Sequence, residues 1–357
     1  MKRILVRAPN SIEDQILSFP FFGSLRQNHP NAWISVVCSE RTKHFQFRRL
    51  VDDVVVLPSL RSRGLFSSMR AIYQAAKQLR ELGPWDYGVL VPNSFGSALL
   101  FRLAKVKKIR GYAVDGRSVL LHEKLKWQVG HRSNQTQFSS GYMRGKTHRA
   151  QVYLDLVPPL GRAQTPENWA KRFDPVEQWP DFSPIEPPED RYFVVAPWDR
   201  YETKRWPIER FAEFAMQLQE ATGWRPLLIA EEKSVSARFK ALMRTPFVDY
   251  VAAAPVPAFW KVFERAQLTV CNDSFFAHVA SLCRSKVQVI GGGFDPVATR
   301  PIGPGQVIFY TNPVICWPCA SKNCSQVGTH RLSCLTETSV QNALDQCRGE
   351  LFHGEFA

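Results

Sequence analysis

Residues 268–274 read LTVCNDS, a short apolar run that ends in three polar residues, and this stretch shows the pattern that decides the fold. The β-branched and apolar residues favour a buried strand, expected over 267–271. Asn, Asp and Ser directly after it favour the N-terminus of a helix, expected over 274–282. A strand that passes straight into a helix is typical of the βα units that build parallel sheets.

The same alternation of strand and helix recurs along most of the chain. In the first half, we expect strands near 3–7, 33–38, 54–57, 87–91 and 108–112, with helices near 14–28, 67–82 and 96–105. In the second half, we expect strands near 192–196, 226–230, 267–271 and 287–290, with helices near 207–222, 234–243, 257–265, 274–282 and 339–347. The pattern predicts two doubly wound α/β domains of similar build.

A proline-rich stretch separates the two halves, because residues 158–188 hold eight prolines and little periodicity. The predicted organisation is a first domain over 1–157, a linker over 158–190, a second domain over 191–336 with a cysteine-rich loop at 316–334, and a C-terminal helix and tail over 337–357. Two such domains are expected to leave a cleft between them. In open α/β sheets, ligands bind at the carboxyl ends of the strands.

Composition excludes a mainly disordered chain, since 45% of the 357 residues are hydrophobic and 12% are aromatic. The net charge of +14 is uneven. Residues 1–150 hold 25 Lys and Arg against 9 Asp and Glu, a net charge of +16, and residues 151–357 carry a net charge of −2. The first half is therefore expected to meet an anionic partner, which can be nucleic acid, an acidic membrane surface or a phosphorylated substrate.

No stretch of the sequence predicts export or membrane insertion. The N-terminal apolar run ends at Pro9, which is too short for a signal peptide, and the longest uncharged stretch, residues 301–321, holds four prolines. We therefore expect a cytosolic protein. Its eight cysteines would be free thiols or metal ligands before disulfides.

In each predicted domain, one candidate site follows the first strand. Asp14 is either a group that stabilises a helix N-terminus or a general base for a hydroxyl nucleophile. Thr203, Lys204 and Arg205 come just before Pro207, which fits the first position of a helix. They form either an ordinary solvated loop or a phosphate-binding cluster, in which Lys204 would contact a diphosphate.

The polar residues after the strand at 267–271 form a third candidate site. Asn272, Asp273 and Ser274 either only cap the next helix or hold a sugar or phosphate at its N-terminus. His278, one turn into that helix, is as readily a packed residue as a ligand. The glycines at 291–293 allow a close backbone approach, but they match neither a dinucleotide fingerprint nor a phosphate loop.

The cysteine-rich loop is a candidate metal site. Cys316, Cys319, Cys324 and Cys334 lie within 19 residues, so they could bind a structural zinc or iron ion tetrahedrally. The alternative is a set of free or disulfide-paired thiols that brace the loop.

In their shared order, these motifs resemble those of glycosyltransferase family 9, the ADP-heptose:lipopolysaccharide heptosyltransferases. Asp14 and Pro20 match the family's opening, with Glu13 in place of the usual Gly. His148-Arg149 with Tyr153-Leu154 resembles its helix before the linker, and TKRWP at 203–207 is similar to its Lys-Arg-Trp-Pro segment. The sequence NDS at 272–274 with His278 resembles its Asn-Asp-Ser-Gly-Pro-x-His motif, but Phe275-Phe276-Ala277 departs from it. Residues 293–296 and the cysteine cluster with Leu335 also have counterparts.

The resemblance implies a GT-B fold, with two Rossmann-like domains that face each other across a cleft. It implies an inverting, metal-independent transfer in which Asp14 deprotonates the acceptor hydroxyl and Lys204 neutralises the diphosphate. The other donor-binding residues would be Thr203, Arg205, Asn272, Asp273, Ser274 and His278, with Glu231 or Glu232 on the ribose. Arg7 and Arg117 are the predicted acceptor-binding residues of the basic first domain.

The sequence thus predicts transfer of heptose from ADP-heptose to the inner core of lipopolysaccharide, at the cytoplasmic face of the inner membrane. No cofactor is expected for catalysis, and no nucleic acid as a partner. One alternative is a family member with another nucleotide-sugar donor or a protein acceptor. The others are a basic nucleic-acid-binding protein with a cysteine–metal module, and a non-catalytic relative that acts as a partner subunit.

Overall fold

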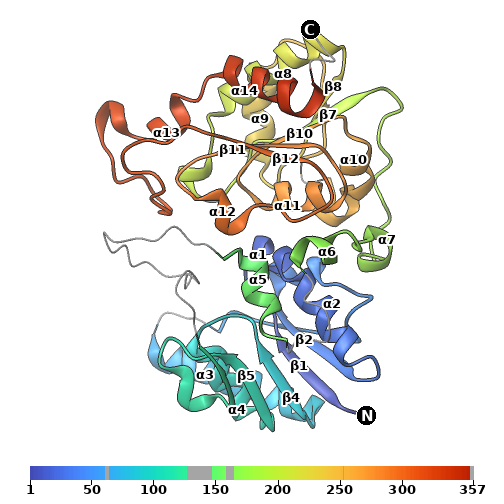
Figure 1. Cartoon of the computed structure of the whole chain (residues 1–357), viewed down its shortest axis with the longest axis vertical. Helices are drawn as coiled ribbons and strands as arrows, with labels where there is room; N and C mark the ends of the chain where they lie inside the picture. The colour runs from blue at the N-terminus through green and yellow to red at the C-terminus, as the bar shows by residue number, and fades with distance from the viewer. Residues whose placement is uncertain (61–63, 127–146, 158–164, 252, 354–357) are drawn as a thin grey trace. The chain divides into compact units, whose positions relative to one another are not determined.

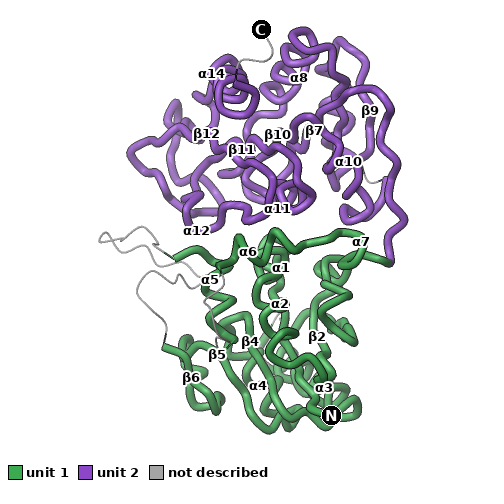
Figure 2. Tube along the Cα trace, turned by 45° about the vertical axis from the view of Figure 1, so that its right-hand side comes forward, with its two compact units in different colours: residues 1–180 green, residues 181–357 purple. Residues whose placement is uncertain are grey.

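The computed structural model describes residues 1–60, 64–126, 147–157, 165–251 and 253–353. The chain folds as two compact units, residues 1–180 and 181–357 (Figure 2). Each unit contains one six-stranded sheet covered by helices (Figure 1). The predicted α/β fold class is confirmed.

The sheet of unit 1 has the strand order β3-β2-β1-β4-β5-β6, and all of its neighbouring strands are parallel. The strands are β1 (Arg3–Arg7), β2 (Trp33–Ser39), β3 (Asp53–Leu57), β4 (Tyr87–Leu90), β5 (Lys108–Tyr112) and β6 (Glu123–Leu125). The last four residues of β1 are buried, as expected of a central parallel strand.

The helices of unit 1 cover both faces of its sheet. They are α1 (Ile12–Leu17), α2 (Phe19–Asn28), η1 (Glu40–Phe45), α3 (Leu65–Leu82), α4 (Phe95–Leu103), η2 (Arg117–Leu120), α5 (Arg149–Leu154), α6 (Pro166–Ala170) and α7 (Pro175–Gln178). The helix expected over 14–28 is two helices, because Pro20 lacks the N–H of a continuous helix and its ring would meet the carbonyl of Ile16.

Unit 2 repeats the topology of unit 1, with the order β12-β11-β10-β7-β8-β9 and parallel neighbours throughout. Its strands are β7 (Tyr192–Ala196), β8 (Arg225–Leu228), β9 (Val248–Asp249), β10 (Thr269–Asn272), β11 (Val287–Gly291) and β12 (Val307–Thr311). Counted along each unit, both sheets have the order 3-2-1-4-5-6, which is the Rossmann order.

The helices of unit 2 include the expected long helix after the Lys204 segment. They are η3 (Glu202–Lys204), α8 (Ile208–Thr222), α9 (Lys233–Leu242), η4 (Val256–Phe259), α10 (Trp260–Arg265), α11 (Phe275–Leu282), α12 (Pro296–Thr299), η5 (Gly328–His330), α13 (Ser333–Thr336), α14 (Val340–Gln346) and η6 (Cys347–Leu351). Among the described residues, no helix is both long and apolar enough to span a bilayer.

Each unit has its own hydrophobic core. In unit 1, α3 and α4 cover one face of the sheet and share a buried cluster that includes Ile72, Leu79 and Phe101. In unit 2, α8 and α14 pack in a cluster that includes Trp206, Phe211 and Leu344. These cores hold the sheet edges, where the candidate residues lie, at fixed positions.

Two short helices of the predicted linker, α6 and α7, are part of unit 1. The Phe173 ring, between them, lies 5.1 Å from the Phe19 ring and 4.9 Å from the Trp179 ring. Gly23 in α2 permits this packing, since a Cβ there would lie 2.5 Å from the ring of Trp169 in α6. The described part of the proline-rich stretch is therefore structured by aromatic packing.

We predict that Gly23→Ala destabilises the protein. Alanine favours a helix over glycine by up to about 1 kcal/mol, but overpacking against a buried ring costs about 1–3 kcal/mol. Urea unfolding followed by tryptophan fluorescence should give a midpoint below that of the wild type. Gly349→Ala is the matched control, because a Cβ at Gly349 would meet nothing within 4 Å. A midpoint for Gly23→Ala at or above that of Gly349→Ala would contradict the argument.

Candidate active site

Asp14 lies in the first turn of α1, directly after the carboxyl end of β1. The helix N-terminus is capped by Ser11, whose Oγ accepts from the backbone N–H of Asp14 at 3.1 Å. The Asp14 carboxylate is therefore not the capping group. The residue is 8% exposed, so its charge needs another partner.

That partner is Arg149, the first residue of α5. Arg149 Nη1 donates to Asp14 Oδ1 at 3.0 Å, and the two side chains are 22% and 12% exposed. Tyr153, one turn further along α5, hydrogen-bonds to the same carboxylate through its hydroxyl. One side of α5 thus supplies both a cation and a hydroxyl to Asp14.

These contacts determine the ionisation of the site. Burial by itself raises the pKa of Asp14, but the charge of Arg149 and the hydrogen bonds from Tyr153, Ser11 and Arg149 together outweigh it, so the pKa lies below its ordinary value. Burial and the charge of Asp14 raise the pKa of Tyr153 well above its ordinary value. At neutral pH the site holds a carboxylate, a guanidinium and a neutral phenol.

Arg7 and Arg117, predicted to bind the acceptor, are used inside unit 1. Arg7 is 6% exposed and donates to the carbonyls of Ala8 and Val37 and to the Asn10 side chain. Arg117 is fully buried and donates to the carbonyls of Tyr112 and Pro92 and to Asn93 Oδ1.

We correct the prediction for Arg117. Its guanidinium joins the segments that follow β4 and β5, and it has no exposed surface with which to meet an acceptor. Burial lowers the pKa of Arg117 to about 10, and that of Arg7 to about 10. In both arginines, the guanidinium donates to backbone carbonyls and to an asparagine side chain of the same unit.

In unit 2, Lys204 and Asp273 come together at the carboxyl ends of the adjacent strands β7 and β10. Lys204 Nζ lies 3.0 Å from Asp273 Oδ2, donates to the Asp273 carbonyl at 2.8 Å and sits 4.6 Å from the centroid of the Phe294 ring. Both residues are buried, with Lys204 9% and Asp273 5% exposed. The ammonium is thus held in one place, on the side of the sheet where α/β folds bind ligands.

The neighbours of Lys204 hold its loop in position. Thr203 Oγ1 donates to the Ser321 carbonyl, and the Thr203 carbonyl accepts from the Gly293 N–H at 3.0 Å. A Cβ at Gly292 would lie 2.0 Å from the Thr203 carbonyl oxygen, which confirms that the glycine run allows a close backbone approach. Arg205 donates to the carbonyls of Asp199 and Arg200, so it closes its own loop.

The other residues predicted at this edge have different positions. Asn272 Oδ1 accepts from the Trp206 N–H at 2.9 Å, which joins the end of β10 to the start of α8. Ser274 Oγ, at the N-terminus of α11, is buried and has no hydrogen-bond partner among the described residues. His278 is 3% exposed inside α11.

The departure from the family motif at Phe275 and Phe276 is a core feature. Their side chains are 1% and 0% exposed, and the two rings stack with centroids 4.2 Å apart. Neither residue lines the pocket that unit 2 forms at the carboxyl ends of β8 and β9.

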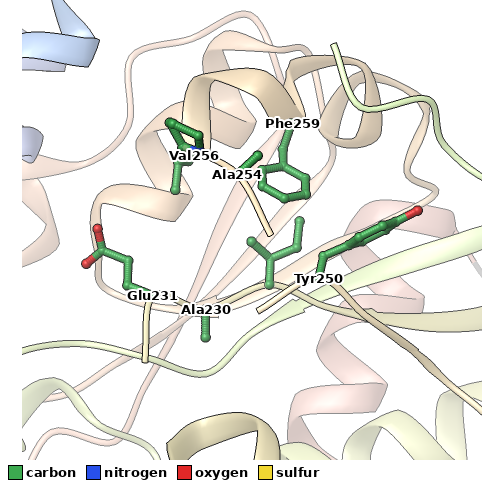
Figure 3. A pocket seen from close by; sticks show the side chains of 8 residues that line it. Ala230, Glu231, Tyr250, Ala254, Val256 and Phe259 are labelled. Atoms are coloured by element: carbon green, nitrogen blue, oxygen red, sulfur yellow. The ribbon is translucent and has the colours of Figure 1, made fainter. Parts of the chain in front are cut away.

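That pocket, of about 170 Å³, opens at the carboxyl ends of β8 and β9 (Figure 3). Glu231 and Tyr250 stand at opposite ends of it, with Ala254, Val256 and Phe259 along one wall. Glu232 does not line it. It precedes α9 and accepts a long hydrogen bond from Ser234 Oγ at 3.4 Å. Of the two glutamates predicted for the ribose, Glu231 lines this pocket and Glu232 does not.

The cysteine-rich loop docks on the Lys204 segment. The Cys324 N–H donates to Glu202 Oε1 at 2.7 Å, and Arg331 pairs with the same carboxylate at 2.5 Å. Burial raises the pKa of Cys334 to about 11, with smaller increases from Cys319, Cys316 and Cys324 nearby. The four thiols are thus neighbours, but no group of three or more His, Cys, Asp or Glu side chains in the described part of the chain is arranged to hold a metal ion.

Comparison with known proteins identifies the family of this chain. Residues 72–330 match the model of glycosyltransferase family 9 (heptosyltransferase). The chain belongs to glycosyltransferase family 9. The matched region includes Lys204 and Asp273 but not Asp14.

Known heptosyltransferases are similar to this chain in sequence and in fold. Lipooligosaccharide heptosyltransferase 2 of Haemophilus ducreyi is 28% identical over 122 residues, which span 34% of this chain and 34% of that protein. The ADP-heptose lps heptosyltransferase II of E. coli superposes with a TM-score of 0.71 at 18% identity, over 99% of this chain and 100% of its own. E. coli heptosyltransferase WaaC with ADP gives a TM-score of 0.66 at 18% identity, over 98% of this chain and 99% of its own. The fold is GT-B, as the resemblance predicted.

Two partners of Asp14, Arg149 and Tyr153, could not be assigned to it from the sequence. The sequence predicts that both belong to one helix, but Arg149 is 135 residues away from Asp14 along the chain. The available signal was their i, i+4 spacing, which places both side chains on one face of a helix.

We predict that Arg149→Met destabilises the protein in a pH-dependent way. Removing one partner of a largely buried pair costs about 3–5 kcal/mol, and less here because both side chains retain some exposure. In the wild type, the lowered pKa of Asp14 gives stability above its unfolded pKa that is lost as pH falls through the folded pKa. In the variant, burial dominates and raises that pKa, so lowering the pH from 7 to 4.5 should narrow the deficit.

The double variant Asp14→Asn/Arg149→Met is the control, since it leaves no unpaired carboxylate. Urea unfolding at both pH values should show the double variant more stable than Arg149→Met at pH 7, with a smaller pH dependence. An equal deficit for both variants at both pH values would show that the loss comes from packing and not from charge.

Proposed function

We propose that this glycosyltransferase moves heptose from ADP-heptose to the inner core of lipopolysaccharide, with inversion at the anomeric carbon. The observation that carries the proposal is the buried Lys204 ammonium at the carboxyl end of β7, on the same edge of the unit 2 sheet as the pocket at the ends of β8 and β9. A fixed cation next to a pocket suits a nucleoside diphosphate, which has a planar base at one end and a charged diphosphate at the other.

The strand order supports this arrangement of the donor. β7 lies between β10 and β8, and neighbouring strands are about 4.8 Å apart, so the Lys204 segment and the pocket are adjacent along one edge of the unit 2 sheet. The base would enter the pocket beside Tyr250, and Glu231 would accept from the ribose hydroxyls. The diphosphate would then meet Lys204, near the N-terminus of α11 and the unpartnered Ser274 Oγ. The E. coli heptosyltransferase WaaC, which has a similar fold, is known in a structure with ADP, and this supports the proposal of an adenine nucleotide.

Unit 1 would bind the acceptor and supply the base. The acceptor hydroxyl oxygen forms the new bond to the anomeric carbon, the bond from that carbon to the diphosphate breaks, and ADP leaves with the electron pair. The hydroxyl proton passes to Asp14. Lys204 stabilises the negative charge that develops on the leaving diphosphate.

The lowered pKa of Asp14 suits a late proton transfer. A carboxylate paired with Arg149 is ionised at neutral pH but is a weak base towards a neutral alcohol. The alcohol becomes strongly acidic only once its oxygen begins to bond to the anomeric carbon. Asp14 would therefore orient the hydroxyl in the ground state and accept its proton in the transition state.

We place the enzyme at the cytoplasmic face of the inner membrane, where a lipid-anchored, phosphorylated acceptor would be presented to it. The net charge of +16 on residues 1–150 supports an anionic acceptor for unit 1. A different donor sugar or a protein acceptor is the nearest alternative.

The proposed transfer needs no metal ion, since Lys204 supplies a cation to the diphosphate. Chelation with EDTA should leave the transfer rate unchanged, and a loss of activity restored by magnesium would contradict this.

A structural zinc or iron ion on Cys316, Cys319, Cys324 and Cys334 would require these side chains to turn toward a common point. Elemental analysis of the purified protein, compared with that of Cys319→Ser, tests it.

Two variants test the proposed roles separately. Lys204→Met should weaken ADP binding by about 10- to 100-fold, which corresponds to a lost hydrogen bond to a charged group. Asp14→Asn should bind ADP as the wild type does and lower kcat by about 10²- to 10⁴-fold. Calorimetric titration measures the first, and transfer from ADP-heptose to lipopolysaccharide from a heptose-deficient strain measures the second.

Lys261→Met is the matched control for Lys204, because Lys261 pairs with the exposed Glu186 elsewhere in unit 2. Wild-type ADP binding by Lys204→Met would remove the diphosphate role, and wild-type turnover by Asp14→Asn would remove the base. Faster turnover of a UDP-sugar than of ADP-heptose would overturn the donor assignment.

A further inference from the structure

Helix α3 of unit 1 exposes a stripe of large apolar side chains. Phe66 is 91%, Met69 43% and Tyr73 56% exposed, although α3 is an 18-residue helix packed on the sheet. Their spacing of three and four residues places them on one face. Single exposed apolar residues are common, but three aligned along one helix form an apolar patch, which is typical of an interaction surface.

Cations share this face. Arg70, Lys77 and Arg80 fall, with the apolar residues, within an arc of about 100° around the helix axis. The Arg80 guanidinium lies over the Tyr73 ring at 5.7 Å, and Lys77 is 4.0 Å from Glu81, the one acidic residue of the helix. We call the face formed by Phe66, Met69, Arg70, Tyr73, Lys77 and Arg80 the α3 face.

The opposite side of α3 is fixed in the core of unit 1. Ile72, Ala75, Ala76 and Leu79 are buried in the cluster that α3 shares with α4. The exposed apolar residues of the α3 face therefore do not result from loose packing of the helix, because the other side of α3 is well buried. The α3 face is a fixed amphipathic surface with aromatic and basic groups side by side.

The α3 face begins at the functional edge of the sheet. α3 follows β3 and α4 follows β4, so both helices start on the side where Asp14 follows β1. Phe95, the first residue of α4, is also 46% exposed. A Cβ on the next residue, Gly96, would lie 3.5 Å from Ile72, which sets the start of α4 alongside α3.

We propose that the α3 face docks unit 1 on an anionic phospholipid bilayer, an inference that rests on the proposed function in taking a lipid-anchored acceptor. Exposed aromatic side chains beside Lys and Arg are what interfacial helices use to bind anionic membranes. A second copy of the chain is a poorer occupant, since symmetric pairing would bring cations against cations. Docking by this face would hold the acceptor's sugar near the edge that carries Asp14.

Vesicle co-sedimentation tests the surface. The wild type should bind vesicles of 70% phosphatidylethanolamine and 30% phosphatidylglycerol, bind phosphatidylcholine vesicles far less, and lose affinity as salt rises. Arg70→Glu/Lys77→Glu should lower the affinity by about tenfold or more. Phe66→Ser/Tyr73→Ser should lower the affinity as well, but without changing how steeply the affinity falls as salt rises.

Two controls match these variants. Lys105→Glu/Lys108→Glu makes the same charge change at exposed residues after α4 and at the amino end of β5, which are not part of the α3 face. Val176→Ser removes a 58% exposed apolar side chain on α7. Both controls should bind anionic vesicles as the wild type does, and all variants should keep wild-type ADP binding and wild-type transfer to a delipidated, water-soluble acceptor.

The outcomes separate this inference from the proposed function. Vesicle binding by the α3 variants equal to that of the wild type, or an equal loss in the Lys105/Lys108 control, would overturn the docking surface even if heptose transfer is found. A wild type that ignores vesicles but forms a dimer disrupted by Phe66→Ser/Tyr73→Ser would overturn it in favour of a contact between copies. Specific vesicle binding without heptose transfer would retain the surface and remove the proposed acceptor.

Discussion

The ion pair between Asp14 and Arg149 is the interaction on which the candidate active site of unit 1 depends. A carboxylate that is 8% exposed requires a cation or a proton, and the chain supplies a guanidinium from 135 residues away. The pair joins α1, which follows the first strand, to α5, which precedes the proline-rich stretch. The buried Asp14 carboxylate therefore keeps its charge in the folded chain because these distant segments meet.

A similar pair fixes the site in unit 2, with the charges in other roles. There the cation, Lys204, is the proposed ligand-binding group, and Asp273 Oδ2 lies 3.0 Å from its ammonium. The surrounding loops leave the ammonium little freedom, because Gly292 and Gly293 let the Thr203 backbone approach and the cysteine-rich loop closes on Glu202. A diphosphate bound here, as proposed, would compete with Asp273 for an ammonium that is already in place, so binding would cost little further ordering of the lysine side chain.

The central strands of both sheets could be predicted from sequence, because parallel strands buried on both faces form short apolar runs. β1, β5 and β7 have the predicted bounds. The three missed strands, β6, β9 and β12, all lie at sheet edges, where burial leaves a weaker pattern, and β9 has only two residues.

Within the sites, sequence order identified the strand ends but not the side-chain partners. Asp14, Lys204 and Asp273 could be named because each follows a strand. Whether a nearby residue faces the site depends on backbone direction after the strand, which composition does not encode. Glu231 and Glu232 are adjacent and chemically identical, yet only Glu231 lines the pocket. Arg117 follows β5 as a functional residue would, but its guanidinium turns inward.

Only the exposed part of the positive charge of unit 1 can attract an external partner. Arg7, Arg117 and Arg149 serve backbone carbonyls or the Asp14 carboxylate, and they contribute little field outside the unit. The cations that an external partner meets are exposed ones such as Arg70 and Lys77. Net charge alone would favour any polyanion, including nucleic acid. It is the exposed Phe66 and Tyr73 between those cations that favour a partner with both negative charge and an apolar interior, and a lipid bilayer is the partner that has both.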